Sequence, residues 1–308
     1  MCIQSDFGNY LSTIIGAEEL PLLQRQTAAV LLKSLLERKS EVMLRPWFEY
    51  IKIALIKALC DVPIELARAI GNCISTIVWY KDFNVWPNIL SDLASLIKTG
   101  RKGAENAIIC LEEICEDMEI ISRIKSEKFE VLIPLLISIA RDKEQIGRTR
   151  GAAIYSLTFG YITTAGGIFE KYINEVIKLI FELIQEIFNN EQPDEFIEKH
   201  LCGLSIIFLK DKREGVIPIC KQLFDFHMKV LGSRNYEAAC AGCDFWQIYL
   251  KTDWSPDYEE QRWKLLKSIL PELIPQLLLA LCYSDTDLSG MVKNSKLDVR
   301  EDEEQDGN

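Results

Sequence analysis

Residues 63–98, PIELARAIGNCISTIVWYKDFNVWPNILSDLASLIK, predict two amphipathic helices joined by a short polar turn. Apolar residues recur at three- and four-residue steps, which is the spacing of one helix face. The predicted stripes are Leu66, Ile70, Ile74 and Ile77 on the first helix, and Trp86, Leu90, Leu93 and Ile97 on the second. Because one hairpin cannot bury both stripes alone, this segment requires neighbours of the same kind.

The ends of these two helices carry ordinary capping signals. Asp61 stands just before Pro63, and Asn84 stands before Pro87. Asp and Asn accept hydrogen bonds from free backbone N–H groups, and proline is tolerated in the first helical turn. We therefore expect the first helix over 63–80 and the second over 86–98.

The same pattern recurs along the chain. Residues 5–15 resemble the second helix of a hairpin whose first helix is absent. The other predicted pairs are 18–37 with 46–60, 102–117 with 127–141, 144–162 with 168–189, 194–209 with 215–231, and 235–251 with 259–282.

Mostly small residues mark the middle of each predicted first helix, where two helices approach closely. They are Ala29, Gly71, Ile109, Ala152, Gly203 and Ala241, at spacings of 42, 38, 43, 51 and 38. This period fits two-helix HEAT-type repeats better than the shorter tetratricopeptide or ankyrin repeats. The predicted fold is therefore an all-α, right-handed superhelical α-solenoid of HEAT repeats with about six to seven hairpins; the alternative is an irregular helical bundle.

Composition narrows the class of protein. The chain has 308 residues, 48% of them apolar, and its longest apolar runs are about half of a membrane span. The N-terminus has no signal-peptide pattern, so we expect a soluble intracellular protein without membrane insertion. Net charge is −11, which argues against nucleic acid as the main ligand because that affinity comes from Lys and Arg.

The ten cysteines do not form a disulfide framework. Cys60, Cys73, Cys110, Cys115, Cys202 and Cys220 lie within helical patterns, where free cysteine behaves as a small buried apolar residue. Cys240 and Cys243 form a C-x-x-C, but no second ligand pair accompanies them, so small packing residues are the favoured interpretation.

Catalytic candidates are scarce. His200 and His227, the only histidines, fall on separate predicted helices, and the adjacent Glu112 and Glu113 should diverge around theirs. The Gly147-x-x-x-Gly151 motif lacks the Lys-Ser/Thr ending of a phosphate loop. We expect no enzyme, no metal and no cofactor.

The composition changes at Ser284. Residues 284–308 have little periodicity and end in an acidic run, so we expect a solenoid over 1–283 and a flexible acidic tail over 284–308. Trp79, Trp86 and Trp246 should pack in the core. Trp254 and Trp263 flank an acidic connection, where partial exposure would suit contact with a partner.

Several segments resemble, in order, the importin-β (karyopherin-β) family of nuclear transport receptors, and within it the N-terminal third of the transportins. These segments are 6–11, 24–33, 86–90, 114–117, 237–246, 270–275 and 283–288. The most specific is EAACAGCDFW at 237–246, which resembles the family segment E-A-C-E-F-W with extra residues.

The resemblance implies a non-catalytic nuclear import receptor found in cytoplasm and nucleus. Its partners would be the small GTPase Ran in the GTP form, bound by the second helices, and phenylalanine-glycine nucleoporins at the first helices. Carried over, the candidate Ran contacts are Glu49, Asn88, Asp92, Asp298, Glu301, Asp302, Glu303 and Glu304. The tail resembles the start of the family's acidic loop, and the cargo site should be absent from this chain.

A second function class remains open. A static HEAT scaffold, similar to the scaffold subunit of a protein phosphatase, has the same helical pattern. Such a scaffold would hold its partner regardless of nucleotide, so nucleotide dependence separates the two hypotheses.

Overall fold

The structure is a computed structural model and is all-helical throughout the part of the chain that it describes. The described residues are 6–39, 45–81, 86–116, 129–163, 167, 169–190, 192, 194–211, 220–233, 236–254 and 256–280. They fall into two compact units, one within residues 1–211 and one within 212–308.

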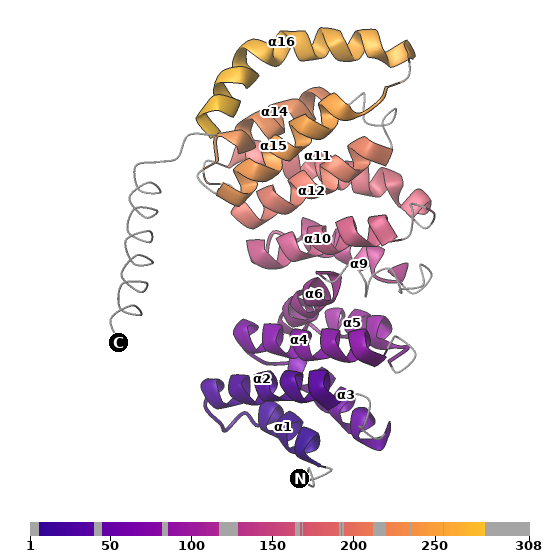
Figure 1. The fold of residues 1–308 in the computed structure, drawn as a ribbon, viewed down its shortest axis with the longest axis vertical. Coiled ribbons are helices and arrows are strands. Elements are labelled where there is room, and N and C mark those ends of the chain that lie inside the picture. The colour runs from indigo at the N-terminus through magenta and orange to yellow at the C-terminus, as the bar shows by residue number, and fades with distance from the viewer. Residues whose placement is uncertain are drawn as a thin grey trace, which may run out of the picture. The chain divides into compact units, whose positions relative to one another are not determined.

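The first unit holds most of the helices (Figure 1). They are α1 (Phe7–Gly16), α2 (Leu22–Lys39), α3 (Arg45–Leu59), α4 (Ile64–Lys81), α5 (Ile89–Ile97), α6 (Arg101–Cys115), α9 (Ile133–Arg141), α10 (Gly147–Thr163), the 3-10 turn η1 (Phe169–Lys171), α11 (Ile173–Asn189) and α12 (Glu195–Asp211). The second unit holds α14 (Cys220–Leu231), α15 (Tyr236–Lys251) and α16 (Pro256–Ala280).

Two layers of helices form the first unit. The first helices of successive repeats, α2, α4, α6, α10 and α12, each pack on the next and make the first-helix layer. Among the second helices, α1 packs on α3 and α9 packs on α11, making the second-helix layer. Two such layers, one of first helices and one of second helices, are the arrangement of a solenoid of two-helix repeats, in which each repeat contacts its neighbours.

The hairpin at 63–98 shows why the layers hold together. Every residue of both predicted stripes is buried, from Leu66, Ile70 and Leu93 at 0% exposure to Ile97 at 9%. Burial of one such side chain contributes about 1.5–3 kcal/mol. Gly71 supplies the close approach to the next repeat, because a Cβ there would lie 3.1 Å from the Cα of Cys110.

The start of the second helix differs from prediction. The helix α5 begins at Ile89, because residues 86–88 form a turn in which the Trp86 carbonyl accepts a hydrogen bond from the Ile89 N–H at 3.2 Å. Asn88 therefore takes the N-cap position, without a side-chain cap hydrogen bond. Asn84, the predicted cap, and the proposed boundary at 283/284 lie outside the described residues.

An aromatic cluster fills the second unit. Phe224 on α14 lies 4.9 Å from Trp246 and 4.8 Å from Tyr249 of α15, measured between ring centroids. His227 stacks on Phe245 at 3.6 Å. Trp246 is in the core as predicted, whereas Trp263 is 44% exposed.

Most free cysteines follow the prediction, but Cys240, which was expected to pack, is exposed, and Cys243 is only partly buried. Cys73, Cys110, Cys115, Cys202 and Cys220 are buried. Cys60 is exposed, contrary to expectation, because it follows the last residue of α3 and lies in the turn beyond the apolar stripe.

Candidate functional site

Two of the predicted partner-binding carboxylates are joined by a chain of polar contacts between second helices. Glu49 on α3 is exposed and pairs with Lys52, with 2.7 Å between Oε1 and Nζ. The Lys52 ammonium lies 5.9 Å from the centre of the Trp86 ring, and the Trp86 indole N–H donates to Asp92 Oδ2 at 3.0 Å. These contacts connect Asp92, half-buried at the first turn of α5, to Glu49 on α3.

Asn88 lies at the end of this chain of contacts. Its side chain is exposed and its backbone carbonyl accepts the Asp92 N–H at 2.8 Å. We name Glu49, Lys52, Trp86, Asn88 and Asp92 the α3–α5 patch. The other predicted contacts, Asp298, Glu301, Asp302, Glu303 and Glu304, lie outside the described residues.

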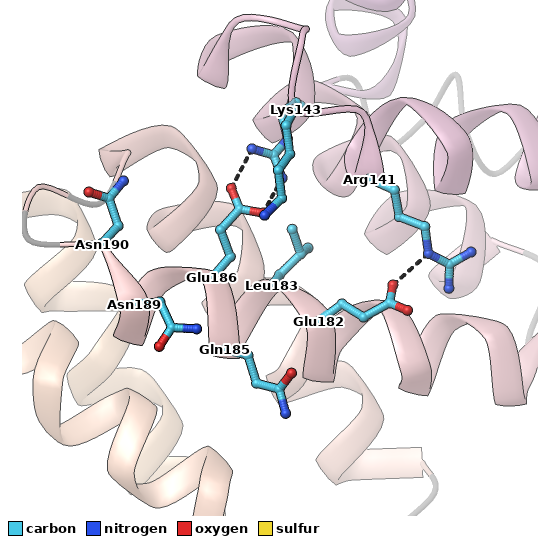
Figure 2. A pocket seen from close by; sticks show the side chains of 9 residues that line it. Arg141, Lys143, Glu182, Leu183, Gln185, Glu186, Asn189 and Asn190 are labelled. Atoms are coloured by element: carbon cyan, nitrogen blue, oxygen red, sulfur yellow. Dashed lines mark hydrogen bonds and ion pairs between the residues drawn. The ribbon is translucent and has the colours of Figure 1, made fainter.

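Sequence reasoning missed a groove of about 650 Å³ beside α11, which we call the α11 groove (Figure 2). Its charged lining is Arg141, Lys143, Arg150, Glu182 and Glu186, with Gln185, Asn189 and Asn190 beside them. Glu186 and Arg150 form a two-pronged ion pair, at 2.6 and 2.9 Å. This pairing holds the pKa of Glu186 below its usual value.

Arg150 also ties two repeats together. Its side chain is 6% exposed, and its Nε–H donates to the carbonyl of Ala140, near the end of α9, at 2.9 Å. A carbonyl in the last turn of a helix has no partner within that helix, so the arginine satisfies it and complements the helix dipole. Arg25 of α2 does the same for Ile15 of α1, also at 2.9 Å.

A second set of polar contacts crosses the first-helix layer. Glu113 of α6 pairs with Arg68 of α4 at 3.1 Å, and Glu112 points instead to Arg148 of α10 at 3.8 Å. The two adjacent carboxylates thus diverge, as predicted. Burial raises the pKa of Glu112 to about 7.

Within the described residues, no group of three His, Cys, Asp or Glu could hold a metal ion. Burial also raises the pKa of the Cys73, Cys115 and Cys220 thiols, to about 12 in each case, which keeps them unreactive. Across the same residues, no helix is both long and apolar enough to span a bilayer.

The fold and these surfaces define a class of protein, an α-solenoid of HEAT repeats with polar patches on its second helices. No family model matches the chain. The chain is similar to transportin of Dictyostelium discoideum (25% identity over 285 residues) and to importin subunit beta-2 of Schizosaccharomyces pombe (26% over 294 residues). Each match covers 92% of this chain but only 29% and 30% of the relative, so the chain spans less than a third of their length.

Solved structures agree on the fold. Importin beta in a polyethylene glycol condition superposes with a TM-score of 0.67 at 17% identity, over 92% of this chain and 36% of that one. Kap95p in a structure concerned with RanGDP gives 0.65 at 18% identity (89% and 34%), and the Kap95:Nup1 complex gives 0.60 at 16% (92% and 35%).

The resemblance to the importin-β family is thereby confirmed over nearly the whole chain. The matching relatives are transport receptors rather than enzymes, which agrees with the expectation of a non-catalytic chain.

Proposed function

We propose that this chain is the Ran-GTP-binding and nucleoporin-contacting portion of a nuclear transport receptor, working in cytoplasm and nucleus. The observation that carries the proposal is the similarity to transportin and importin subunit beta-2 over 92% of the chain. Structural neighbours captured with a Ran protein and with a nucleoporin support both kinds of partner.

The α3–α5 patch supports a site for a basic partner. Glu49 is largely exposed, and Asp92 has one oxygen engaged by the Trp86 indole. Because the chain carries a net charge of −11, long-range attraction would favour a basic surface and would weaken as salt screens it. We further propose that the acidic tail over 284–308 adds to this attraction through Asp298, Glu301, Asp302, Glu303 and Glu304.

Nucleotide-dependent binding tests the proposal. The chain should retain Ran loaded with a non-hydrolysable GTP analogue in a pull-down and release Ran loaded with GDP. Retention of both forms alike would instead indicate a static scaffold, and retention of neither would contradict Ran binding.

Charge-removing variants test the site itself. Glu49→Gln and Asp92→Asn keep the side-chain shapes, and each should weaken Ran-GTP binding about threefold to tenfold. Glu260→Gln is the matched control, because Glu260 is an exposed carboxylate that pairs with Lys264 on α16. Equal affinity of all three variants would remove the α3–α5 patch from the proposal.

A further inference from the structure

A second groove in the first unit is built from the same repeat positions as the α11 groove. It lies among α1, α2 and α3, has a volume of about 480 Å³, and is named the N-terminal groove. Residues of the two linings correspond in number: 125 positions after Gly16, Glu18 and Arg25 of the N-terminal groove stand Arg141, Lys143 and Arg150 of the α11 groove. In the same way, 128 positions after Ala54, Lys57, Ala58 and Asp61 stand Glu182, Gln185, Glu186 and Asn189.

The two arginines are anchored identically. Arg25 donates its Nε–H to the Ile15 carbonyl and Arg150 donates its own to the Ala140 carbonyl, both at 2.9 Å. Ile15 and Ala140 are themselves related by the same shift of 125. As whole residues, Arg25 is 6% exposed and Arg150 is 5% exposed. Each guanidinium is therefore held buried at the end of the preceding second helix.

The partners of the two guanidinium groups differ. Glu186 accepts hydrogen bonds from both terminal nitrogens of Arg150, at 2.6 and 2.9 Å. In the N-terminal groove Ala58 stands at the position of Glu186, and Ala54 stands at that of Glu182. The buried Nη2 of Arg25 accordingly has no hydrogen-bond acceptor among the described residues.

The lining of the N-terminal groove carries two cations, Arg25 and Lys57, and two carboxylates, Glu18 and Asp61. Lys57, which is exposed on the same wall, replaces the neutral Gln185 and adds a second cation. Of the carboxylates at the rim, Asp61 already pairs with Lys102, and Glu18 is exposed and forms no ion pair with Arg25. A buried guanidinium without a counter-ion is costly, so a carboxylate supplied from outside would gain a charge-assisted hydrogen bond.

We propose that the N-terminal groove binds an acidic side chain of a partner protein, whose carboxylate takes the place that Glu186 fills in the α11 groove. One repeat has its carboxylate built in, and the other receives it from a glutamate or aspartate of the partner. The groove is far larger than a carboxylate alone, which suits an extended peptide segment carrying that side chain. This site does not depend on the binding of Ran.

Binding of model peptides to the full chain tests the proposal. The probe is a fluorescein-labelled, C-terminally amidated hexapeptide of alternating Gly and Glu, followed by fluorescence anisotropy. Its Gln counterpart should bind at least tenfold more weakly, because the guanidinium then faces a neutral amide. Equal binding of the two peptides, or binding of neither, would overturn the proposal.

Variants separate the groove from adventitious contacts. Ala58→Glu supplies an internal carboxylate and should reduce binding of the Glu peptide at least tenfold, whereas the equally large Ala58→Gln should reduce it less. Glu186→Ala should open the α11 groove and raise the stoichiometry from one peptide to two. Unchanged binding by Ala58→Glu, or displacement of the peptide by an equal concentration of inorganic phosphate, would refute an acidic side chain as the ligand.

Discussion

Removing the charge of Glu186 should loosen the junction between two repeats far more than removing that of its neighbour Glu182. Glu186→Gln keeps the size of the side chain and leaves one of its two hydrogen bonds to Arg150. The other terminal nitrogen of Arg150 then faces an amide N–H₂ instead of a carboxylate oxygen. The Arg150 side chain is only 6% exposed, so water cannot readily replace that acceptor.

The magnitude follows from burial. Breaking a buried ion pair by removing one partner costs about 3–5 kcal/mol. Glu186 is 24% exposed and glutamine retains one acceptor, so we expect about 2 kcal/mol for Glu186→Gln. Glu182 pairs with Arg141 at 2.6 Å, but the two side chains are 40% and 33% exposed, so Glu182→Gln should cost under about 1 kcal/mol.

Hydrogen exchange of the first turns of α10 and the last turn of α9 provides the assay. A loss of 2 kcal/mol corresponds to about 30-fold faster exchange through local opening. Urea denaturation followed by circular dichroism gives the global change in free energy for comparison. Equal effects of the two substitutions would refute the reasoning that the buried guanidinium holds this junction.

The pH dependence of this junction has a definite sign. Arg150 lowers the pKa of Glu186 in the folded chain. The pair therefore stabilises the fold above the unfolded pKa of about 4.5 and loses that contribution as pH falls through the folded pKa. Glu186→Gln should lack this acid-dependent loss, which denaturation series at pH 7 and below pH 4.5 would reveal.

Three other changes have expected outcomes. Gly160→Ala should destabilise the first unit by about 1–3 kcal/mol, because the added methyl would meet the buried Phe129 ring. The methyl of Gly203→Ala meets nothing within 4 Å, so that substitution should be neutral or stabilising. Thermal melts of both variants test this difference. The folded pKa of Glu112 is about 7, so the parent chain should lose stability as pH rises from about 4.5 to 7, whereas Glu112→Gln should not. The Tm of the variant minus the Tm of the parent should therefore increase between pH 5 and pH 8. A constant Tm difference would contradict this. Burial lowers the pKa of His227, so only the unfolded chain takes up the proton as pH falls below about 6.5, and the second unit should lose stability there. Thermal melts at pH 5 and 7.5 should show a smaller pH dependence of stability in His227→Phe than in the parent chain.

Sequence periodicity predicted the helices well because the stripes that define them are local. The buried stripes of 63–98 and the close approach at Gly71 both follow from spacing alone. The start of α5 was misplaced because the turn at residues 86–88 sets it, a detail that the Trp-Pro-Asn letters do not show.

The grooves could not be predicted because their key contacts join distant parts of the chain. Arg25 and Arg150 bond to carbonyls ten residues earlier, across a turn, and Glu186 reaches Arg150 from the far end of the repeat. A signal did exist, since Arg-x-x-Ala follows the start of both first helices, at 25–28 and 150–153. Binding at the α3–α5 patch stays a prediction; the contacts that join Glu49 to Asp92 through Lys52 and Trp86 could not be seen in the sequence.

The buried cysteines can report which part of this solenoid opens first. Cys73, Cys110, Cys202 and Cys220 lie on four different helices, α4, α6, α12 and α14, and each thiol is shielded by the packing of its helix. A thiol reagent would modify the exposed Cys60 and Cys240 first. The order in which the shielded thiols react afterwards would show which repeat unravels first.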